Sequence, residues 1–411
     1  MRISVDRVYD KIIWFLTVFL FACFLIFDTY TWGKYAFLAA SIMIFAITVL
    51  KGRLKIKIKI GAYQWFFLVF IVYSLLTSVW AMNASDTLTM SRTLFRILVC
   101  SSLLYFYYVE QDDVGALLRA IMWAGYIVAI YSIIFYGLDT VLAATAGANT
   151  RLQNDYSNIN SIGMACALTC VIQFHEFIFD KFRLWKAFFL LPTILMMAAT
   201  QSRKAMILAI LGILAVVVLK NADNKNFIKG FFKVVTGLAV VTVCLVAISK
   251  IEIFSGINER LTSMFNMFTG EGDVDHSAEL RNEMIALGIE WWKQYPVGGI
   301  GIANPHILGA EYLNFDAYLH NNFVELLCGG GVIAFLIYYS MYVYLFINLW
   351  KYRRADKKFF SICFIWLILM FAMDYGMVSY YSKTQWFYLM AQFIGVECLK
   401  KKYKEAKNEN K

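Results

Sequence analysis

The chain has 411 residues, of which 61% are hydrophobic and 17% aromatic, and its mean hydropathy is +0.62. A water-soluble globule of this composition would lack polar surface, so the balance predicts a polytopic membrane protein. The formal net charge of +10 does not indicate nucleic-acid binding, because the lysines and arginines lie in short stretches between apolar runs.

Apolar runs of about 20 residues recur along the chain, and a helix of that length satisfies its own backbone groups across a hydrocarbon core about 30 Å thick. The pattern predicts an all-α fold and one integral membrane domain over residues 1–411. The first run lacks a small-residue cleavage site and is interpreted as a retained helix. In chain order, the about twelve predicted spans are 12–30, 33–50, 61–81, 94–109, 114–137, 161–179, 187–200, 205–219, 231–249, 321–349, 359–378 and 385–399.

Positive charge predicts the orientation of these spans. Lysines and arginines gather in alternate connections and in the tail, within residues 51–59, 181–186, 220–233, 351–358 and 400–411. Such stretches stay on the cytoplasmic side, so both termini are predicted to be cytoplasmic. The exception is Glu110-Gln111-Asp112-Asp113, a connection predicted on the same side without a positive charge.

The connection between residues 250 and 320 is then predicted to face outward. It is long and acidic, and long connections are usually functional. Tyr295-Pro296 is expected to end a helix within it, before glycines turn the chain. That helix is predicted to be amphipathic and to lie along the membrane surface. Its apolar stripe has helical spacing: Leu280, Met284, Leu287 and Trp291.

His320 differs from the other histidines because it stands where the polar connection meets an apolar span. It is predicted to open the following helix, whose dipole favours the neutral imidazole that a general base requires. A capping or core role is the alternative interpretation. His175, His276 and His306 have no comparable context in the sequence.

Three arginines, Arg151, Arg203 and Arg281, stand at the predicted outer boundary of the membrane. A guanidinium group offers a permanently charged fork that suits phosphate oxygens. The alternative for each of them, and for Arg260, is a positive charge that only sets the membrane topology, or a side chain whose buried aliphatic part lets the guanidinium group reach the membrane interface.

No metal site or cofactor is predicted. Asp273-Val274-Asp275 resembles the aspartate pair with which many glycosyltransferases hold a divalent metal, but acids before a helix also supply N-cap oxygens. The eight cysteines lie in or beside apolar runs without ligand spacing and are interpreted as small core residues. Gly329-Gly330-Gly331 is interpreted as permitting close contact with another helix instead of binding phosphate.

The residues from His320 onward resemble the O-antigen ligase and O-antigen polymerase superfamily. The ligase signature is a histidine, then Asn, Ser or Gln, nine residues, a glycine, two residues, and Gly, Thr or Tyr. It reads here as His320-Asn321, Gly331 and Ala334, and only Ala334 departs from it. Three further stretches are similar to the family: 151–163, 201–203 and 280–301.

The resemblance implies a metal-independent, inverting membrane glycosyltransferase of the GT-C type in the bacterial inner membrane, acting on an undecaprenyl-diphosphate-linked oligosaccharide donor. It implies that His320 takes the proton from an acceptor hydroxyl, and that Arg203 and Arg281 hold the diphosphate. Further substrate contacts are expected from Arg151, Arg260 and Asn321.

Polymerase and ligase share this chemistry and differ in the glycan acceptor. The acceptor is another lipid-linked repeat unit for a polymerase and lipid A core for a ligase. The departure at Ala334 favours a polymerase. The alternative from another class is a transporter of lipid-linked polysaccharide. Transporters, however, place polar groups in broken helices near mid-membrane, whereas the charged candidates here gather at one predicted face.

Overall fold

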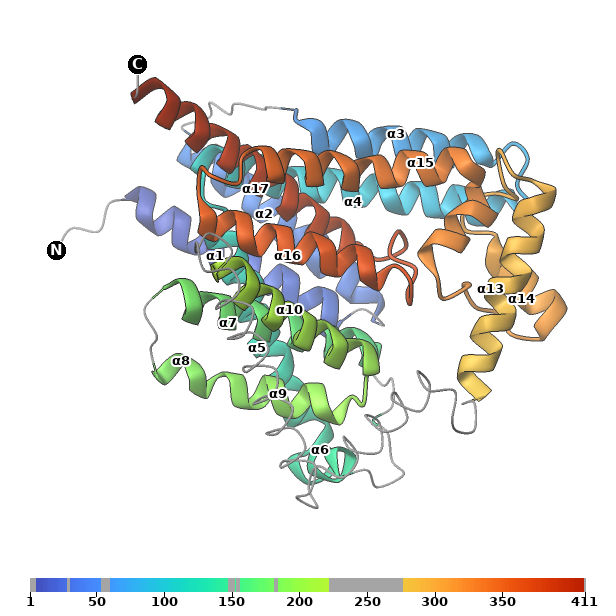
Figure 1. Ribbon diagram of the computed structural model, residues 1–411, viewed down its shortest axis with the longest axis horizontal. Helices are drawn as coiled ribbons and strands as arrows, with labels where there is room; N and C mark the ends of the chain where they lie inside the picture. Colours follow the sequence, from blue (N-terminus) through green and yellow to red (C-terminus); the bar gives the residue numbers. More distant parts are fainter. Residues whose placement is uncertain are drawn as a thin grey trace. The chain divides into compact units, whose positions relative to one another are not determined.

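The computed structural model describes residues 5–27, 30–52, 60–146, 152, 156–180, 184–221 and 276–409 (Figure 1). Within these ranges every regular element is an α-helix and none is a strand, which confirms the predicted all-α fold. Residue contacts divide the chain into two compact units. Unit 1 comprises residues 1–47, 115–272 and 357–369, and unit 2 comprises residues 48–114, 273–356 and 370–411. The single membrane domain stays a prediction.

Unit 1 is organised around α7 (Ile159–Phe179), which packs against α9 (Leu190–Ala199) and α10 (Arg203–Asn221). The Asn158 side chain starts α7 by accepting hydrogen bonds from the N–H groups of Asn160 and Ser161. The remaining helices of unit 1 are α1 (Val5–Ile26), most of α2 (Thr31–Lys51) and of α5 (Val114–Tyr136), α6 (Leu138–Thr145), α8 (Leu184–Phe188) and the first part of α16 (Lys357–Met373).

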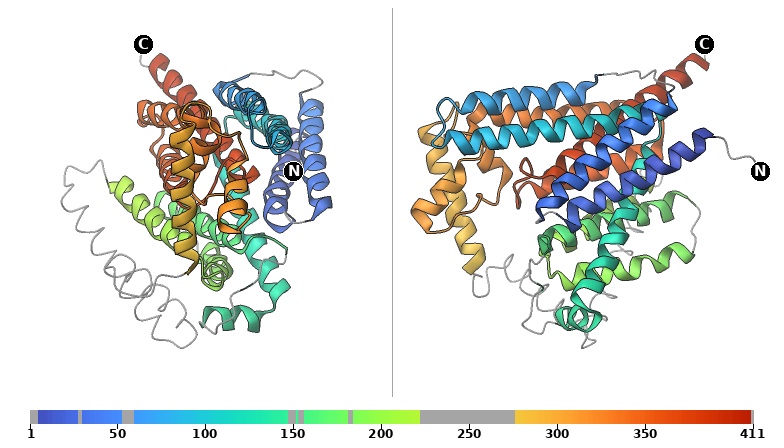
Figure 2. Two further views of the ribbon diagram at one scale, coloured as in Figure 1. Left: turned by 90° about the vertical axis from the view of Figure 1, so that its right-hand side faces the viewer. Right: turned by 180° about the vertical axis from the view of Figure 1, so that it is seen from behind.

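Unit 2 contains α3 (Ala62–Thr77), α4 (Ala84–Gln111) and α15 (Asn322–Lys351), which run side by side. The helix α13 (His276–Gln294) crosses the end of this group, with α14 (Pro305–Leu313) beside it (Figures 1 and 2). Phe67 of α3 stacks on the buried Trp386 of α17 (Lys383–Glu409) with ring centroids 3.6 Å apart. The helix α13 is the one predicted within the long connection, so that prediction is confirmed, and α13 ends before Tyr295-Pro296 as expected.

Each predicted span other than 231–249 overlaps a helix, although α4 begins ten residues before the predicted start at 94 and the span 187–200 covers the end of α8 and all of α9; 231–249 lies outside the described residues. Among the described helices, six are long and apolar enough to cross a membrane: α1, α4, α5, α7, α10 and α15. These helices support a polytopic membrane protein. The number of about twelve spans stays a prediction.

The acidic connection at residues 110–113 finds positive partners elsewhere in unit 2. Lys51 Nζ donates a hydrogen bond to Gln111 Oε1 over 2.9 Å, and Lys401 Nζ lies 3.3 Å from Asp112 Oδ2. One acid of the connection, Asp112, is therefore paired with a lysine of the tail, and Gln111 is bonded to a lysine at the end of α2. These contacts join three of the segments predicted to share the cytoplasmic side, those that contain Lys51, Asp112 and Lys401.

The helix α15 is broken at Gly331, whose φ of 65° and ψ of −170° are not helical. In a regular helix the N–H groups of Val332 and Ile333 would donate to the carbonyls of Cys328 and Gly329. Residues 296–304, called the glycine segment below, supply new hydrogen-bond partners for these two N–H groups and for these two carbonyls. Val332 and Ile333 donate to Pro296 and Val297 over 2.9 and 3.4 Å. Ile300 and Gly301 donate to Cys328 and Gly329 over 2.9 and 2.7 Å.

The connection between α3 and α4 holds the opposite side of the glycine segment. Met82 N–H donates to the Ile300 carbonyl over 2.9 Å, and Trp80 Nε1 donates to the Gly298 carbonyl over 3.1 Å. The buried Asn304 side chain accepts from Asn83 N–H and donates to the Thr87 hydroxyl. The segment is therefore fixed from both sides by hydrogen bonds.

Glycine is required where the segment meets the broken helix. A Cβ atom on Gly331 would lie 2.0 Å from the Val297 carbonyl oxygen, and one on Gly299 would lie 2.5 Å from the Cys328 carbonyl oxygen. Both residues also have positive φ, which disfavours other residues. The close approach predicted for Gly329–Gly331 occurs, but its partner is the glycine segment. For Gly331 this differs from the expected helix partner, whereas a Cβ atom on Gly329 would also lie 3.3 Å from Pro305, the first residue of α14.

We expect Gly331→Ala to abolish the folded protein, because the new methyl group overlaps the Val297 backbone. Gly137→Ala is the matched control, since Gly137 has a φ of 82° but no atom nearer to its added Cβ than 4.0 Å. The control should suffer only backbone strain, about 1–3 kcal/mol. Size-exclusion chromatography and thermal unfolding in detergent measure both variants, and equal stability of the two would contradict the proposed crowding.

Candidate functional site

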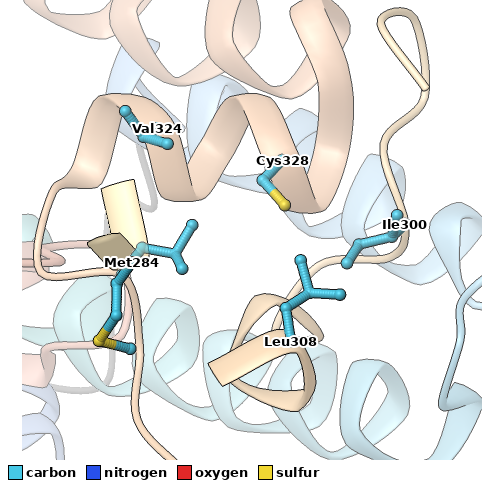
Figure 3. Close-up of a cluster of buried hydrophobic side chains, with 6 residues drawn as sticks. Met284, Ile300, Leu308, Val324 and Cys328 are labelled. Carbon is cyan, nitrogen blue, oxygen red and sulfur yellow. The ribbon is translucent and has the colours of Figure 1, made fainter. Parts of the chain in front are cut away.

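A small hydrophobic cluster holds the connection between α13 and α15 against the start of α15 (Figure 3). Gly288 permits the close approach of α13, because a Cβ atom there would lie 2.4 Å from Leu319 Cδ1. Of the predicted apolar stripe, Met284 is fully buried in the cluster, and Leu287 and Trp291 pack against it. The buried members are Met284, Ile300, Leu308, Leu319, Val324 and Cys328.

Asn321 starts α15 as its N-cap. Its side-chain oxygen accepts hydrogen bonds from the N–H groups of Phe323 and Val324 over 3.0 and 3.1 Å. His320 precedes this cap with a φ of 57°, so it stands just outside the helix that it was expected to open. The alternative in which His320 itself caps the helix was wrong. His320 therefore directly precedes the N-cap of α15.

Glu325 fixes the turn that carries His320. Its carboxylate is fully buried, accepting a hydrogen bond from Leu319 N–H over 2.7 Å and another from the Tyr381 hydroxyl over 2.9 Å. The first bond anchors the residue directly before His320. Sequence reasoning missed Glu325, although a carboxylate within a predicted span was a signal, because such residues are rare unless they have a task.

Asn322 ties the start of α15 to the connection between α16 and α17. Its side-chain nitrogen donates to the Tyr339 hydroxyl over 3.0 Å and to Asp374 Oδ2 over 3.3 Å. Its side-chain oxygen accepts from Ser379 N–H over 2.9 Å. All four residues are buried, and this network holds the first turn of α15 below His320.

Tyr318 connects His320 with Arg281. Its ring centroid lies 4.6 Å from that of His320. Partial burial raises the pKa of Tyr318, the Glu325 carboxylate raises it further, and the Arg281 guanidinium opposes this shift. Arg281, in the second turn of α13, is therefore near enough for its charge to act on Tyr318. Tyr318 is thus in ring contact with one predicted site residue, His320, and under the electrostatic influence of another, Arg281.

A cavity of about 330 Å³ opens beside Tyr318. The imidazole of His306 stands between two carboxylates there, with Nδ1 2.7 Å from Asp316 Oδ1 and Nε2 3.3 Å from Asp86 Oδ2. Tyr381 completes this side of the lining. The sequence gave His306 no context comparable to that of His320, and its partner Asp86 could not be predicted because Asp86 belongs to α4 and is distant along the chain.

In unit 1, Arg203 is the half-buried first residue of α10, after a turn in which Gln201 has a φ of 50°. Gln201 Nε2 donates to the Ala144 carbonyl over 2.9 Å. A Cβ atom on Gly163 would lie 2.5 Å from Thr200 Oγ1, so this turn packs closely on α7. Two of the family-like stretches therefore meet here.

Several predicted residues lie outside the described part of the chain, namely Arg151, Arg260, Asp273 and Asp275. Among the residues that the structure does describe, no group of three His, Cys, Asp or Glu side chains has the arrangement of a metal site. The described cysteines are buried and form no disulfide with one another, as expected of small core residues. The roles of the predicted site residues remain predictions.

Comparison with known proteins identifies one family. Residues 187–339 match the family model described as O-antigen ligase. The matched range includes Arg203, Arg281 and the stretch from His320 to Ala334, so it supports the resemblance seen in the sequence. No curated protein matches the chain.

We expect Glu325→Ala to loosen the turn before His320, because Leu319 N–H would be left buried without an acceptor, at a cost of about 1–3 kcal/mol. Glu325→Gln retains one acceptor and should have a smaller effect. Hydrogen–deuterium exchange of residues 315–325, followed by mass spectrometry, measures the change. The exposed Glu311→Gln is the control. Unchanged exchange in Glu325→Ala would contradict the anchoring role.

Proposed function

We propose that this chain is a membrane glycosyltransferase of the O-antigen ligase and O-antigen polymerase superfamily, a proposal that the match of residues 187–339 to the O-antigen ligase family model supports. The proposed donor is an undecaprenyl-diphosphate-linked glycan, and the proposed acceptor is a sugar hydroxyl. The observation that carries this proposal is the position of His320 within the family match, directly before the N-cap of α15 and in ring contact with Tyr318, whose hydroxyl feels the charge of Arg281.

In the proposed reaction, His320 takes the proton of the acceptor hydroxyl as its oxygen attacks the anomeric carbon of the donor. The bond from that carbon to the diphosphate breaks, and undecaprenyl diphosphate leaves with the electron pair. A single displacement inverts the anomeric configuration and needs no covalent enzyme intermediate. The proposal assigns the stabilisation of the leaving diphosphate to Arg281, since preorganised cations favour developing charge.

The charge of Arg281 supports this assignment. Within residues 276–409 the guanidinium of Arg281 forms no ion pair, so no carboxylate of that range neutralises it. Arg203 receives the second diphosphate contact in the proposal on the basis of its sequence motif. Arg151, Arg260 and Asn321 remain proposed substrate contacts. The Asn321 side-chain oxygen already caps α15, which leaves its nitrogen to donate to a ligand.

We favour a polymerase that joins repeat units, because Ala334 departs from the ligase signature. A ligase that uses lipid A core as acceptor remains the alternative. The proposal includes a GT-C type of fold, a metal-independent reaction, the bacterial inner membrane and cytoplasmic termini. The broken α15 is a feature that transporters also have. Its freed backbone groups, however, are bonded to the glycine segment and offer no ligand contacts, which disfavours transport.

We expect His320→Ala to lower glycan transfer about 10²–10⁴-fold, the usual effect of removing a positioned base. Donor binding should stay near normal. Arg281→Lys keeps the charge but loses the fork, so it should weaken donor binding. Purified protein with lipid-linked donor isolated from membranes allows both binding and transfer to be measured.

Arg354→Lys is the control for that experiment, because the exposed Arg354 lies just beyond the C-terminal end of α15, remote from His320 along that helix. Thermal unfolding establishes that the variants fold equally. Near-normal transfer by His320→Ala would exclude the catalytic role and strengthen the transporter alternative.

The proposal of metal independence has its own test. Transfer by the wild-type protein in EDTA should equal transfer in buffer without EDTA. A loss of transfer in EDTA that manganese restores would contradict metal independence.

The proposed orientation predicts how single cysteines react in a cysteine-free background. Asn314→Cys should react with a membrane-impermeant maleimide added to cells whose outer membrane has been made permeable. Asn408→Cys should react only after the inner membrane is opened. Both residues are exposed, so access to the reagent depends on the side of the membrane. Labelling of position 408 in sealed cells would exclude cytoplasmic placement of the C-terminus.

A further inference from the structure

The cavity around His306 has features of a binding site that the proposed reaction has not used. Its volume of about 330 Å³ is at the lower end of the range for small-ligand sites, roughly 300–1,000 Å³. Its lining comes from separate stretches of unit 2, among them α4, α14, the turn at 316–318 and Tyr381. A fold that gathers polar groups from distant stretches around a cavity positions them for a ligand.

His306 holds the two carboxylates in place. Asp316 stands on a connection with 72% of its side chain exposed, and Asp86 stands on α4 with 37% exposed, yet both contact one imidazole. Asn83 Nδ2 also donates to Asp86 Oδ2. Within the described residues, no hydrogen bond involves Asp86 Oδ1 or Asp316 Oδ2. Each carboxylate therefore keeps an oxygen that can accept a hydrogen bond from a ligand.

The remaining lining fits a sugar ring. The side chains of Thr89 and Thr93 bring hydroxyl groups from α4, and that of Thr93, which donates to the Thr89 carbonyl, can still accept from a ligand. Tyr318 and Tyr381 add aromatic rings, whose centroids lie 6.2 Å apart, against which the apolar face of a sugar can pack. Acceptors, hydroxyls and aromatic faces together match a ligand with many hydroxyl groups and weakly polar faces.

The charge of the lining separates this cavity from the diphosphate contact. Two carboxylates outweigh the single imidazole, so a phosphate or a carboxylate on the ligand would be repelled. The arginine assigned to the diphosphate, Arg281, does not line the cavity. Tyr318 does, and its ring adjoins that of His320. A ligand in the cavity would thus lie one side chain away from the proposed base.

We propose that this cavity binds a neutral or amino-substituted sugar of the acceptor glycan, held by Asp86, Asp316 and the tyrosine rings, and that it selects against uronic acids. The inference rests on the proposed glycosyltransferase function and extends it to the acceptor. His306 acts as a positioning residue, because it orients the two carboxylates.

The test uses the full-length protein, lipid-linked donor at a fixed concentration, and the same glycan freed of its lipid as the varied acceptor. Asp316→Asn and His306→Gln should each raise the KM for acceptor about tenfold, which corresponds to about 1.4 kcal/mol. Their kcat should stay within about twofold of the wild-type value. Asp316 is largely exposed, so its substitution leaves the fold intact. Glu311→Gln, an exposed substitution on α14, is the matched control and should change neither parameter.

Charge selection has a separate readout. Free glucosamine should compete with the acceptor at least about tenfold better than free glucuronic acid, and Asp316→Asn should narrow that difference. If glucosamine and glucuronic acid competed equally with the acceptor, or if neither competed, the proposed selection against uronic acids would be overturned. Unchanged KM in both pocket variants, or a fall in kcat alone, would overturn the acceptor site.

The experiments distinguish failure of the acceptor-site proposal from failure of the proposed glycosyltransferase function. Transfer that persists in His320→Ala would overturn the catalytic proposal whatever the pocket variants do. Saturation-transfer NMR with the lipid-free glycan then detects binding without turnover. Signals that weaken in Asp316→Asn and persist in Glu311→Gln would support the cavity as a glycan site, whereas equal signals in both would overturn it.

Discussion

The exchange of backbone hydrogen bonds between the broken α15 and the glycine segment determines the arrangement of the candidate site. Backbone groups that lack partners in an apolar environment cost several kcal/mol each, so the break at Gly331 persists only with the segment in place. The same segment bonds to the connection between α3 and α4 and leads directly into α14. The positions of His306, the cavity and the turn before His320 follow from this one contact.

Much of the fold of this chain is predictable because membranes impose simple patterns. Apolar runs locate the helices, and the stripe that includes Met284 locates α13 with its buried face. The tertiary contacts are not predictable in this way. The role of His306 depends on its contact with Asp86, and that of Glu325 on its hydrogen bonds with Leu319 and Tyr381. Neither the spacing of residues nor composition reveals which side chains meet in this way. Gly331 was noticed as a place of close approach, but its partner was another glycine-rich stretch instead of a helix.

The family-like stretches meet in pairs within each unit. In unit 1 the turn before Arg203 packs on Gly163 of α7. In unit 2 the stretch that ends at Gly301 bonds to the stretch that begins at His320. Small residues make both contacts possible, since a Cβ at Gly163 or Gly299 would overlap its neighbour. Motifs that look like separate catalytic signatures in the sequence therefore also carry structural constraints.

The bond exchange at Gly331 also bears on how the protein is assembled. A regular α15 would satisfy Val332 and Ile333 through Cys328 and Gly329, and the broken α15 satisfies the same four groups through the glycine segment. The two arrangements satisfy these groups equally well. A nascent chain can thus enter the bilayer with α15 continuous and let the previously synthesised segment dock afterwards, without exposing a bare amide to lipid at either stage.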